Sequence, residues 1–263
     1  MHVQMVAFAA HKDGNGPDEW EDGVVTGQDP RRARFIVLDG ATEAYDVRRW
    51  VDQLGGAFMG LDSSPSSRAP RLDQKGMNTW FAAMQDRWVA SAPASGDAIE
   101  REKLRRHGAF ATMLGCEITG LDGPAPVWRA VALGDTVLFH VRNDRLLSVF
   151  PNLGPGDFGS TPEVVHTKRA SLERMSTHLA FERGDLKAGD LMFAATDALA
   201  HWIITSHANR QPGLWRKLAT LWPAEFIELI AAERQLGQMV NDDVTLLRLR
   251  VVAQRPSAVL ICR

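Results

Sequence analysis

The chain has 263 residues and a mass of 29.0 kDa, with 45% hydrophobic and 24% charged residues, a composition typical of a soluble globular protein without long disordered tails. Its net charge of −2 excludes a strong overall attraction to nucleic acid or to an anionic membrane. No signal peptide and no apolar run of the ~18 residues needed to span a membrane is found, so we expect a cytoplasmic protein that acts on a small, soluble or protein-borne substrate.

The first part of the chain predicts three strands and then two helices. The strands are short apolar runs between polar turn segments: Val3–Ala9, Val24–Thr26 and Arg34–Asp39. After Gly40, apolar residues of Ala41–Met59 recur at helical spacing, and a second amphipathic helix that contains Trp80 and Trp88 ends near Ser91. Two successive helices can cover one face of a sheet.

The remaining chain predicts further strands on either side of a group of helices. From Gly108 onward, turns separate four apolar runs typical of an antiparallel meander: Phe110–Ile118, Val127–Leu133, Val137–Val141 and Leu146–Phe150. A Gly/Pro-rich loop follows at Pro151–Thr161, and residues Arg183–Asp190 are expected to turn into the next strand. The later elements are strand Leu191–Ala195, helices Ala198–Thr205, Leu214–Leu221 and Ala224–Arg234, and strands Val244–Val252 and Ala258–Cys262.

This order of elements predicts an α+β fold, a four-layer α-β-β-α sandwich of two antiparallel sheets flanked by helices, with residues 1–263 in a single domain. Aromatic residues at helical spacing are expected in the core: Trp80, Phe81, Trp88, Trp202, Trp215 and Trp222. Cys116 and Cys262 lie in apolar runs without a CxxC partner, which favours core thiols over a zinc site or a disulfide.

Acidic residues stand where the predicted strands begin or end. Glu21 and Asp22 precede a strand, Asp39 and Asp197 each close one, Asp135 interrupts a strand pair, and Asp242 opens the strand that begins near Val244. A sandwich would bring these strand ends together, and several carboxylates on rigid edges form an oxygen-rich site suited to hard divalent cations. The pattern predicts a metal centre, for which phosphate chemistry is the first use to consider.

The sequence Leu-Asp-Gly occurs twice and provides an internal comparison. The copy at Leu121–Gly123 is followed by Pro124 and joins two strands of the meander, as a structural turn does, so we expect Asp122 to be a turn residue. The copy at Leu38–Gly40 ends an apolar strand and precedes a long helix. There the carboxylate of Asp39 and the carbonyl of Gly40 can both face a ligand.

Taken in order, the acidic segments resemble the metal-dependent type 2C protein phosphatase family, in particular its bacterial Ser/Thr phosphatases. That family has Glu-Asp in an early loop, a strand that ends in Asp-Gly, Gly-Asp in a central hairpin, a strand that ends in Ser-Asp-Gly, and Asp-Asn or Asp-Asp before Ile/Val-Thr. The matching segments, which span residues 1–253, are Trp20-Glu21-Asp22, Val37-Leu38-Asp39-Gly40, Leu133-Gly134-Asp135-Thr136, Ala195-Thr196-Asp197-Ala198 and Asn241-Asp242-Asp243-Val244-Thr245.

The resemblance implies two Mn²⁺ or Mg²⁺ ions. Their ligands would be Asp39, Asp197 and Asp242 for one ion, and Glu21, Asp39 and the Gly40 carbonyl for the other. Asp39 would bridge the two ions and is therefore a candidate catalytic residue. Asp135 matches a position that helps to hold a weaker third metal in some members; the alternative for Asp135 is a turn residue between two strands.

Several positions depart from the family pattern. The basic residue that contacts the substrate phosphate is replaced by Pro17, which leaves Lys12 as the nearest candidate for substrate binding. His201 stands where an acidic third-metal ligand is common. It is a candidate catalytic residue with three interpretations: a third-metal ligand, a proton donor to the leaving alkoxide, or a histidine packed between Leu199 and Trp202.

The function that the resemblance implies is hydrolysis of phosphoserine or phosphothreonine on a protein, by a hydroxide that bridges the metals, in a signalling role opposite a Ser/Thr kinase. The pKa of such a bridging water would fall from ~15.7 toward ~7. The alternative is a pseudophosphatase that binds a phosphoprotein without turnover, which the altered phosphate contact favours and the retained acidic set opposes. A nuclease or other two-metal phosphodiesterase is disfavoured by the absence of a basic excess.

Overall fold

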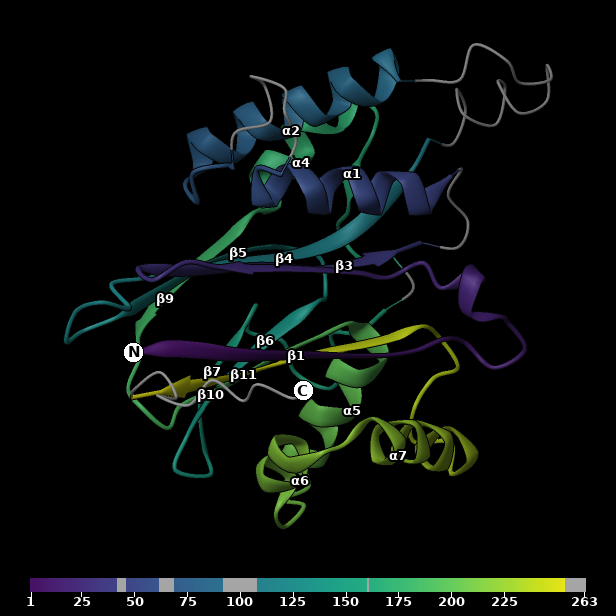
Figure 1. Ribbon diagram of the computed structural model, residues 1–263. Coiled ribbons are helices and arrows are strands. Elements are labelled where there is room, and N and C mark those ends of the chain that lie inside the picture. The colour runs from purple at the N-terminus through teal and green to yellow at the C-terminus, as the bar shows by residue number, and fades with distance from the viewer. Residues whose placement is uncertain (42–45, 62–68, 92–107, 160, 254–263) are drawn as a thin grey trace, which may run out of the picture.

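The computed structural model describes residues 1–41, 46–61, 69–91, 108–159 and 161–253. These residues form two antiparallel sheets packed face to face, with a layer of helices outside each sheet (Figure 1). The predicted α+β fold, a four-layer α-β-β-α sandwich, is therefore confirmed. The strand Ala258–Cys262 expected from the sequence, with Cys262, lies outside the described residues.

The upper sheet in Figure 1 has the strand order β2-β3-β4-β5-β9, with β8 paired to one end of β4. Its strands are β2 (Gly23–Gln28), β3 (Arg32–Gly40), β4 (Phe110–Thr119), β5 (Val127–Leu133), β8 (Val165–His166) and β9 (Ala180–Asp185). Outside it lie α1 (Val47–Met59), α2 (Gln74–Ala90) and α4 (Leu172–His178). A 3-10 turn, η3 (Arg169–Ser171), leads into α4.

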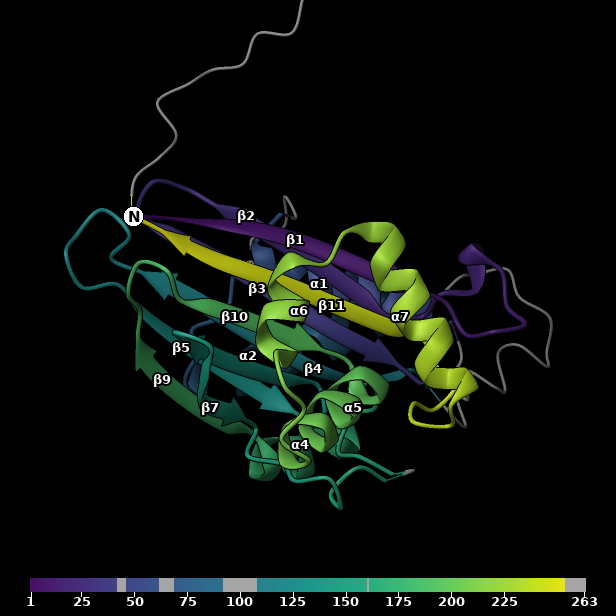
Figure 2. The same ribbon diagram turned by 90° about the horizontal axis from the view of Figure 1, so that it is seen from below.

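The lower sheet has the strand order β1-β11-β10-β6-β7. Its strands are β1 (His2–Ala10), β6 (Val137–Arg142), β7 (Arg145–Phe150), β10 (Leu191–Ala195) and β11 (Val244–Val252). The helices outside it are α5 (Asp197–Ala208), α6 (Leu214–Thr220) and α7 (Pro223–Gln235), seen from below in Figure 2. A short 3-10 turn, η1 (Pro17–Glu19), lies in the loop between β1 and β2.

Strand β3 shows why the central strands read as continuous apolar runs rather than as alternating ones. Phe35 and Val37 face the other sheet, whereas Ile36 and Leu38 face α1 and α2, and all four side chains are fully buried. Successive side chains of a strand point to opposite faces of the sheet, and both faces of β3 are covered, so every side chain in this run is apolar. The predicted core thiol, Cys116 on β4, is likewise buried between the sheets.

The predicted meander is wrong in its pairing. Strand β5 pairs with β4 and β9 in the upper sheet, whereas β6 pairs with β7 and β10 in the lower sheet. The turn at Gly134–Thr136 therefore carries the chain from one sheet to the other instead of closing a hairpin. A change of sheet and a hairpin both require a short turn between apolar runs, so the sequence pattern did not separate them.

Three further expectations require correction, and one helix was not predicted. Residues Arg183–Asp185, expected as part of a turn, belong to β9, and the short helix α4 was not predicted. The first long helix begins at Val47, with residues 42–45 outside the described part of the chain. Trp222 is 72% exposed, whereas the other predicted core aromatics are buried. Trp222 precedes the Pro223 that opens α7, so it lies outside the face of the helix that packs on the sheet.

Among the described residues, no helix is both long enough and apolar enough to cross a membrane.

Candidate active site

A cleft of about 520 Å³ opens where strand ends of both sheets meet. Asp39 is near the end of β3, Asp135 follows β5, Asp197 follows β10 as the first residue of α5, and Asp242 precedes β11. All four line this cleft, together with Lys12 and Gly40. The structure therefore brings together six of the eight site residues predicted from the sequence.

The carboxylate of Asp39 lies near other negatively charged carboxylates. Burial raises the pKa of Asp39 well above its usual value, and the negative charges of its neighbours raise it further; these are Asp22, Asp197, Asp135 and Asp242. Such mutual repulsion requires carboxylates that lie close together. A bound cation would relieve the repulsion, because it favours the ionised form of every group around it.

Asp135 is almost fully buried, with 5% of its surface exposed, and one of its carboxylate oxygens has no hydrogen-bond partner. Burial and the charge of Asp197 raise its pKa to about 7. The preceding Gly134 has a φ of +103°, and a Cβ at that position would lie 2.5 Å from Cβ of Thr112. Only glycine fits this turn, which positions Asp135 between the sheets.

Asp197 and Asp242 form the side of the cleft contributed by the lower sheet. Burial and the charge of Asp242 raise the pKa of Asp197 to about 6. Backbone N–H groups orient both carboxylates: Ala198 donates to Asp197, and Asp243 donates to Oδ1 of Asp242 at 2.9 Å. The ammonium of Lys12 lies 3.6 Å from the same Oδ1, so Lys12 contributes a positive charge to the cleft.

Glu21 lies beside Gly40 through its main chain. A Cβ on Gly40 would be 2.6 Å from the carbonyl oxygen of Glu21 and 2.7 Å from a methyl group of Val47. The absence of a side chain at Gly40 thus allows the Glu21 loop to approach the end of β3. This contact brings two of the predicted ligands of one ion next to each other, although Glu21 is not among the residues that line the cleft.

Two carboxylates that support the site were not assigned a role from the sequence. Asp22 is fully buried, and its Oδ2 accepts hydrogen bonds from the hydroxyls of Thr196 at 3.0 Å and Thr245 at 2.7 Å. Burial raises the pKa of Asp22 well above its usual value, and the charges of Asp243 and Asp197 add to this. The sequence offered one indication that Asp22 belongs to the site: it directly follows Glu21 in the matched motif.

Asp243 connects the segment before β11 to the N-terminal loop. It is 8% exposed, and its two carboxylate oxygens accept hydrogen bonds from the backbone N–H groups of Lys12 at 2.8 Å and Glu21 at 2.6 Å. Both donors belong to predicted site residues. Asp243 therefore holds the loop that carries Lys12 and Glu21 against the strand end that carries Asp242.

His201 lies one helical turn after Asp197 on α5 and is partly exposed. Its ring centroid is 5.2 Å from that of Phe158, in the loop after β7, while its neighbours Leu199 and Trp202 are buried in the core. The imidazole is also close enough to Asp197 to lower that carboxyl group's pKa, against the larger effects of burial and Asp242. All three interpretations of His201 remain predictions.

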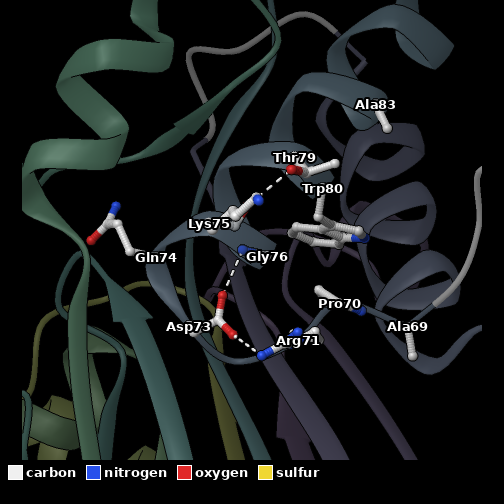
Figure 3. A pocket seen from close by; sticks show the side chains of 10 residues that line it. All are labelled: Ala69, Pro70, Arg71, Asp73, Gln74, Lys75, Gly76, Thr79, Trp80 and Ala83. Atoms are coloured by element: carbon white, nitrogen blue, oxygen red, sulfur yellow. Dashed lines mark hydrogen bonds and ion pairs between the residues drawn. The ribbon is translucent and has the colours of Figure 1, made fainter.

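Asp122 behaves as a turn residue. It lies in the turn between β4 and β5, its side chain is 54% exposed, and it forms an ion pair with Arg31 at 3.4 Å. Asp122 is not among the described residues that line the cleft, so the two Leu-Asp-Gly copies have different environments, as expected. A larger cavity of about 860 Å³ lies over α2 (Figure 3). The one carboxylate among its described lining residues, Asp73, caps α2 through the N–H of Gly76.

The chemistry of the cleft suits a hard divalent cation. Carboxylates and a backbone carbonyl are the ligands that Mg²⁺ and Mn²⁺ prefer, and burial, together with the negative charges of neighbouring carboxylates, raises the pKa values of Asp39, Asp135 and Asp197. Within the described part of the chain, no three Asp, Glu, His or Cys side chains have an arrangement that could already hold a metal ion. The donor set fits such an ion, although its ligands are not arranged as a finished coordination shell.

Comparison with solved structures identifies the fold. The chain is similar to the phosphatase domain of SpoIIE from Bacillus subtilis (17% identity, TM-score 0.50, covering 100% of this chain and 97% of that one). It is also similar to the catalytic domain of the serine/threonine phosphatase PstP in complex with two manganese ions (15% identity, TM-score 0.58, covering 95% of this chain and 98% of that one). A third similar structure is RsbX in complex with magnesium (12% identity, TM-score 0.54, covering 95% of each chain).

The chain therefore has the fold of type 2C (PP2C) protein phosphatase domains, in agreement with the resemblance found in its acidic motifs. No protein-family model matches the sequence, and a comparison with curated proteins found no match.

Proposed function

We propose that this protein is a metal-dependent phosphatase that hydrolyses phosphoserine or phosphothreonine on a partner protein. The observation that carries the proposal is the convergence of Asp39, Asp135, Asp197 and Asp242 on one cleft, in a fold shared with PP2C domains. Residues 1–263 would act as one catalytic domain, with a Ser/Thr kinase opposing it. A phosphoprotein is the substrate class that this fold and the near-neutral net charge support best.

The proposed ligands are Asp39, Asp197 and Asp242 for one Mn²⁺ or Mg²⁺, and Glu21, Asp39 and the Gly40 carbonyl for a second, with Asp135 and Asp197 available to a third. When bound, such ions would supply charge neutralisation at phosphorus and a water of lowered pKa. Asp39 would hold both ions in register. Asp22 and Asp243 would fix the strand ends and loops that carry these ligands through the hydrogen bonds described above.

Lys12 and His201 are the proposed substrate-facing groups. Lys12 lines the cleft, and its ammonium group could contact a phosphate oxygen once Asp242 is engaged by a cation. His201 lies one turn from Asp197, where its imidazole could donate a proton to the leaving oxygen. Phe158 packs against the imidazole and restricts its orientation.

A pseudophosphatase is the second candidate. It is favoured by Pro17, which replaces the basic residue expected before Glu21, and by the engagement of Lys12 with Asp242, which occupies the nearest substitute cation. In that case the protein would bind a phosphoprotein at the same cleft without releasing phosphate.

Rates with three substrates distinguish these functions. We expect hydrolysis of p-nitrophenyl phosphate and of a phosphothreonine peptide to require Mn²⁺, with no hydrolysis of bis-p-nitrophenyl phosphate, a phosphodiester. Binding of the phosphothreonine peptide without phosphate release would favour the pseudophosphatase. Faster hydrolysis of the phosphodiester than of either monoester would reject both candidates in favour of a phosphodiesterase.

A further inference from the structure

Two arginines lie opposite each other at one edge of the upper sheet. Strand β9 is at this edge and pairs with β5 (Figure 2), with Arg183 directly opposite Arg129. Both side chains are exposed, and neither forms a hydrogen bond or an ion pair with any residue that the structure describes. Like charges in directly opposed positions destabilise a sheet, so this arrangement has a cost in stability.

The neighbouring strands compensate for only part of this charge. In register across β3, β4, β5 and β9 lie Arg34, Glu117, Arg129 and Arg183, so one carboxylate serves three guanidinium groups. Arg34 is buried, and the charge of Glu117 opposes the effect of burial, which lowers the pKa of Arg34. With Glu117 engaged in this way, the outer face of β5 and β9 carries two arginines and one carboxylate, that of Asp185, on a protein whose net charge is −2.

The two arginines line a groove of about 520 Å³, which we call the β9 groove; its other lining residues are Leu72, Ala130, Phe181 and Glu182. Phe181 is 38% exposed, and Val127, also on the outer face of β5, is 37% exposed. The carboxylate of Glu182 interacts with Ser148 and His140, which belong to the lower sheet. The groove thus offers two free cations beside apolar surface.

The backbone of β9 is a third feature of the β9 groove that suits a peptide ligand. Within the described part of the chain, β9 pairs with β5 alone, so its outer edge is open to a further strand. An open edge of this kind can bind an extended peptide through main-chain hydrogen bonds. Asp185, at the end of β9, forms an ion pair at 3.3 Å with Arg142, which it shares with Asp190, so its negative charge is offset in part.

We propose that the β9 groove binds an extended acidic segment of a partner protein, which adds a strand to β9 and pairs its carboxylates with Arg129 and Arg183. Arg129 lies four residues before the end of β5 at Leu133, roughly 13 Å along the strand, Asp135 lies beyond the turn that follows, and the β9 groove and the acidic cleft share no described lining residue. A ligand in the groove and a substrate in the acidic cleft could therefore be bound at the same time. The proposal does not depend on phosphatase activity.

Fluorescence anisotropy with short labelled peptides tests the proposal. The probe is a peptide of alternating Glu and Thr residues, compared with a peptide that has Lys in place of Glu and with an N-methylated copy that lacks alternate backbone donors. We expect the Glu peptide to bind, the Lys peptide not to bind, and the N-methylated copy to bind much more weakly. Equal binding of the normal and N-methylated peptides would overturn the strand-addition step.

The first variant is Arg129→Ala/Arg183→Ala. Its matched control is Arg210→Ala/Arg216→Ala, which removes the same charge near α5 and α6, the helices outside the lower sheet (Figure 1). Loss of two charge-assisted contacts should weaken binding about tenfold or more in the first variant only. Its melting temperature should not fall, since a repulsive pair is removed. The proposal would be overturned if the Glu peptide did not bind to the wild-type protein, or if both variants lost the same amount of affinity. The arginines would then serve only to prevent edge-to-edge aggregation.

Discussion

At the scale of single residues, Asp135 links the protonation of the cleft to the stability of the fold. Its pKa is raised from the usual 3.8 to about 7 in the folded protein. Between these two values the folded state binds more protons than the unfolded state, so stability must fall as pH rises. Asp197, with a pKa raised to about 6, contributes in the same direction.

We therefore expect the metal-free protein to lose stability between about pH 4 and pH 7, since each unit of pKa difference is worth about 1.4 kcal/mol. Urea unfolding in the presence of EDTA at several pH values measures this dependence. Asp135→Asn should flatten it, because the amide does not ionise, whereas Asp122→Asn, in an exposed turn, should not. An unchanged pH dependence in Asp135→Asn would show that Asp135 is ionised without penalty.

His201 is the second residue whose role the structure makes testable. If the imidazole donates a proton to the leaving group, His201→Ala should slow hydrolysis of a phosphothreonine peptide much more than that of p-nitrophenyl phosphate, whose leaving group needs little protonation. If it holds a third metal, the Mn²⁺ dependence should shift for both substrates. Unchanged rates and Mn²⁺ dependence, with a lower melting temperature, would leave only the packing of His201 against Phe158.

Single residues also show what the sequence could not reveal about the site. The acids at strand ends were predictable, because the order of Asp39, Asp135, Asp197 and Asp242 matches one family. The roles of Asp22 and Asp243 were not, since their partners are hydroxyls and N–H groups that are distant in sequence. Likewise, the exposure of Trp222 depends on how Pro223 orients the start of α7, not on helical spacing.

At the scale of elements, the loop after β1 and the segment before β11 are joined by side chains from the latter. Asp243 accepts hydrogen bonds from the N–H groups of Lys12 and Glu21, and Asn241 exchanges hydrogen bonds with the main chain of Asp13. Arg234 on α7 donates to the carbonyls of His11 and Asp242. This clasp holds the two loops that carry proposed ligands.

Asp243→Ala should destabilise the protein by about 1–3 kcal/mol, because two N–H groups lose their acceptor in a poorly hydrated site. It should also weaken Mn²⁺ binding, measured by isothermal titration calorimetry, because Glu21 and Asp242 are no longer tied together. Asp29→Ala is the matched control: Asp29 also accepts from two backbone N–H groups, those of Arg31 and Arg32, but in an exposed turn. Equal Mn²⁺ affinity in Asp243→Ala and the wild-type protein would contradict the proposed clasp.

The elements themselves were predictable in proportion to their length and periodicity. Long helices and buried strands such as β3 were recognised from their apolar spacing. Strand β9 and helix α4 were not, because both are short, and β9, at the edge of its sheet, carries charged side chains rather than an apolar run. Edge strands often carry such charges, which remove the apolar signal that identifies a central strand.

At the scale of the whole molecule, the order of strands and helices predicted two sheets and four layers, but not which strands share a sheet. Sheet membership depends on contacts between segments that are distant in sequence, such as β1 with β11 and β3 with β4. The turn at Gly134–Thr136 shows the consequence. It joins the two sheets and thereby carries Asp135 into the cleft, a position that a hairpin within one sheet would not give.

The central claim is that the convergent acids form a metal-dependent phosphatase site. It is tested most directly by the rate of Mn²⁺-dependent phosphate release from a phosphothreonine peptide, measured for Asp39→Asn and Asp122→Asn. These changes are chemically identical and lie in the two Leu-Asp-Gly copies, one in the cleft and one in an exposed turn. We expect Asp39→Asn to lose activity by about 100-fold or more while remaining folded, and Asp122→Asn to retain the wild-type rate. Wild-type turnover in folded Asp39→Asn would contradict the account.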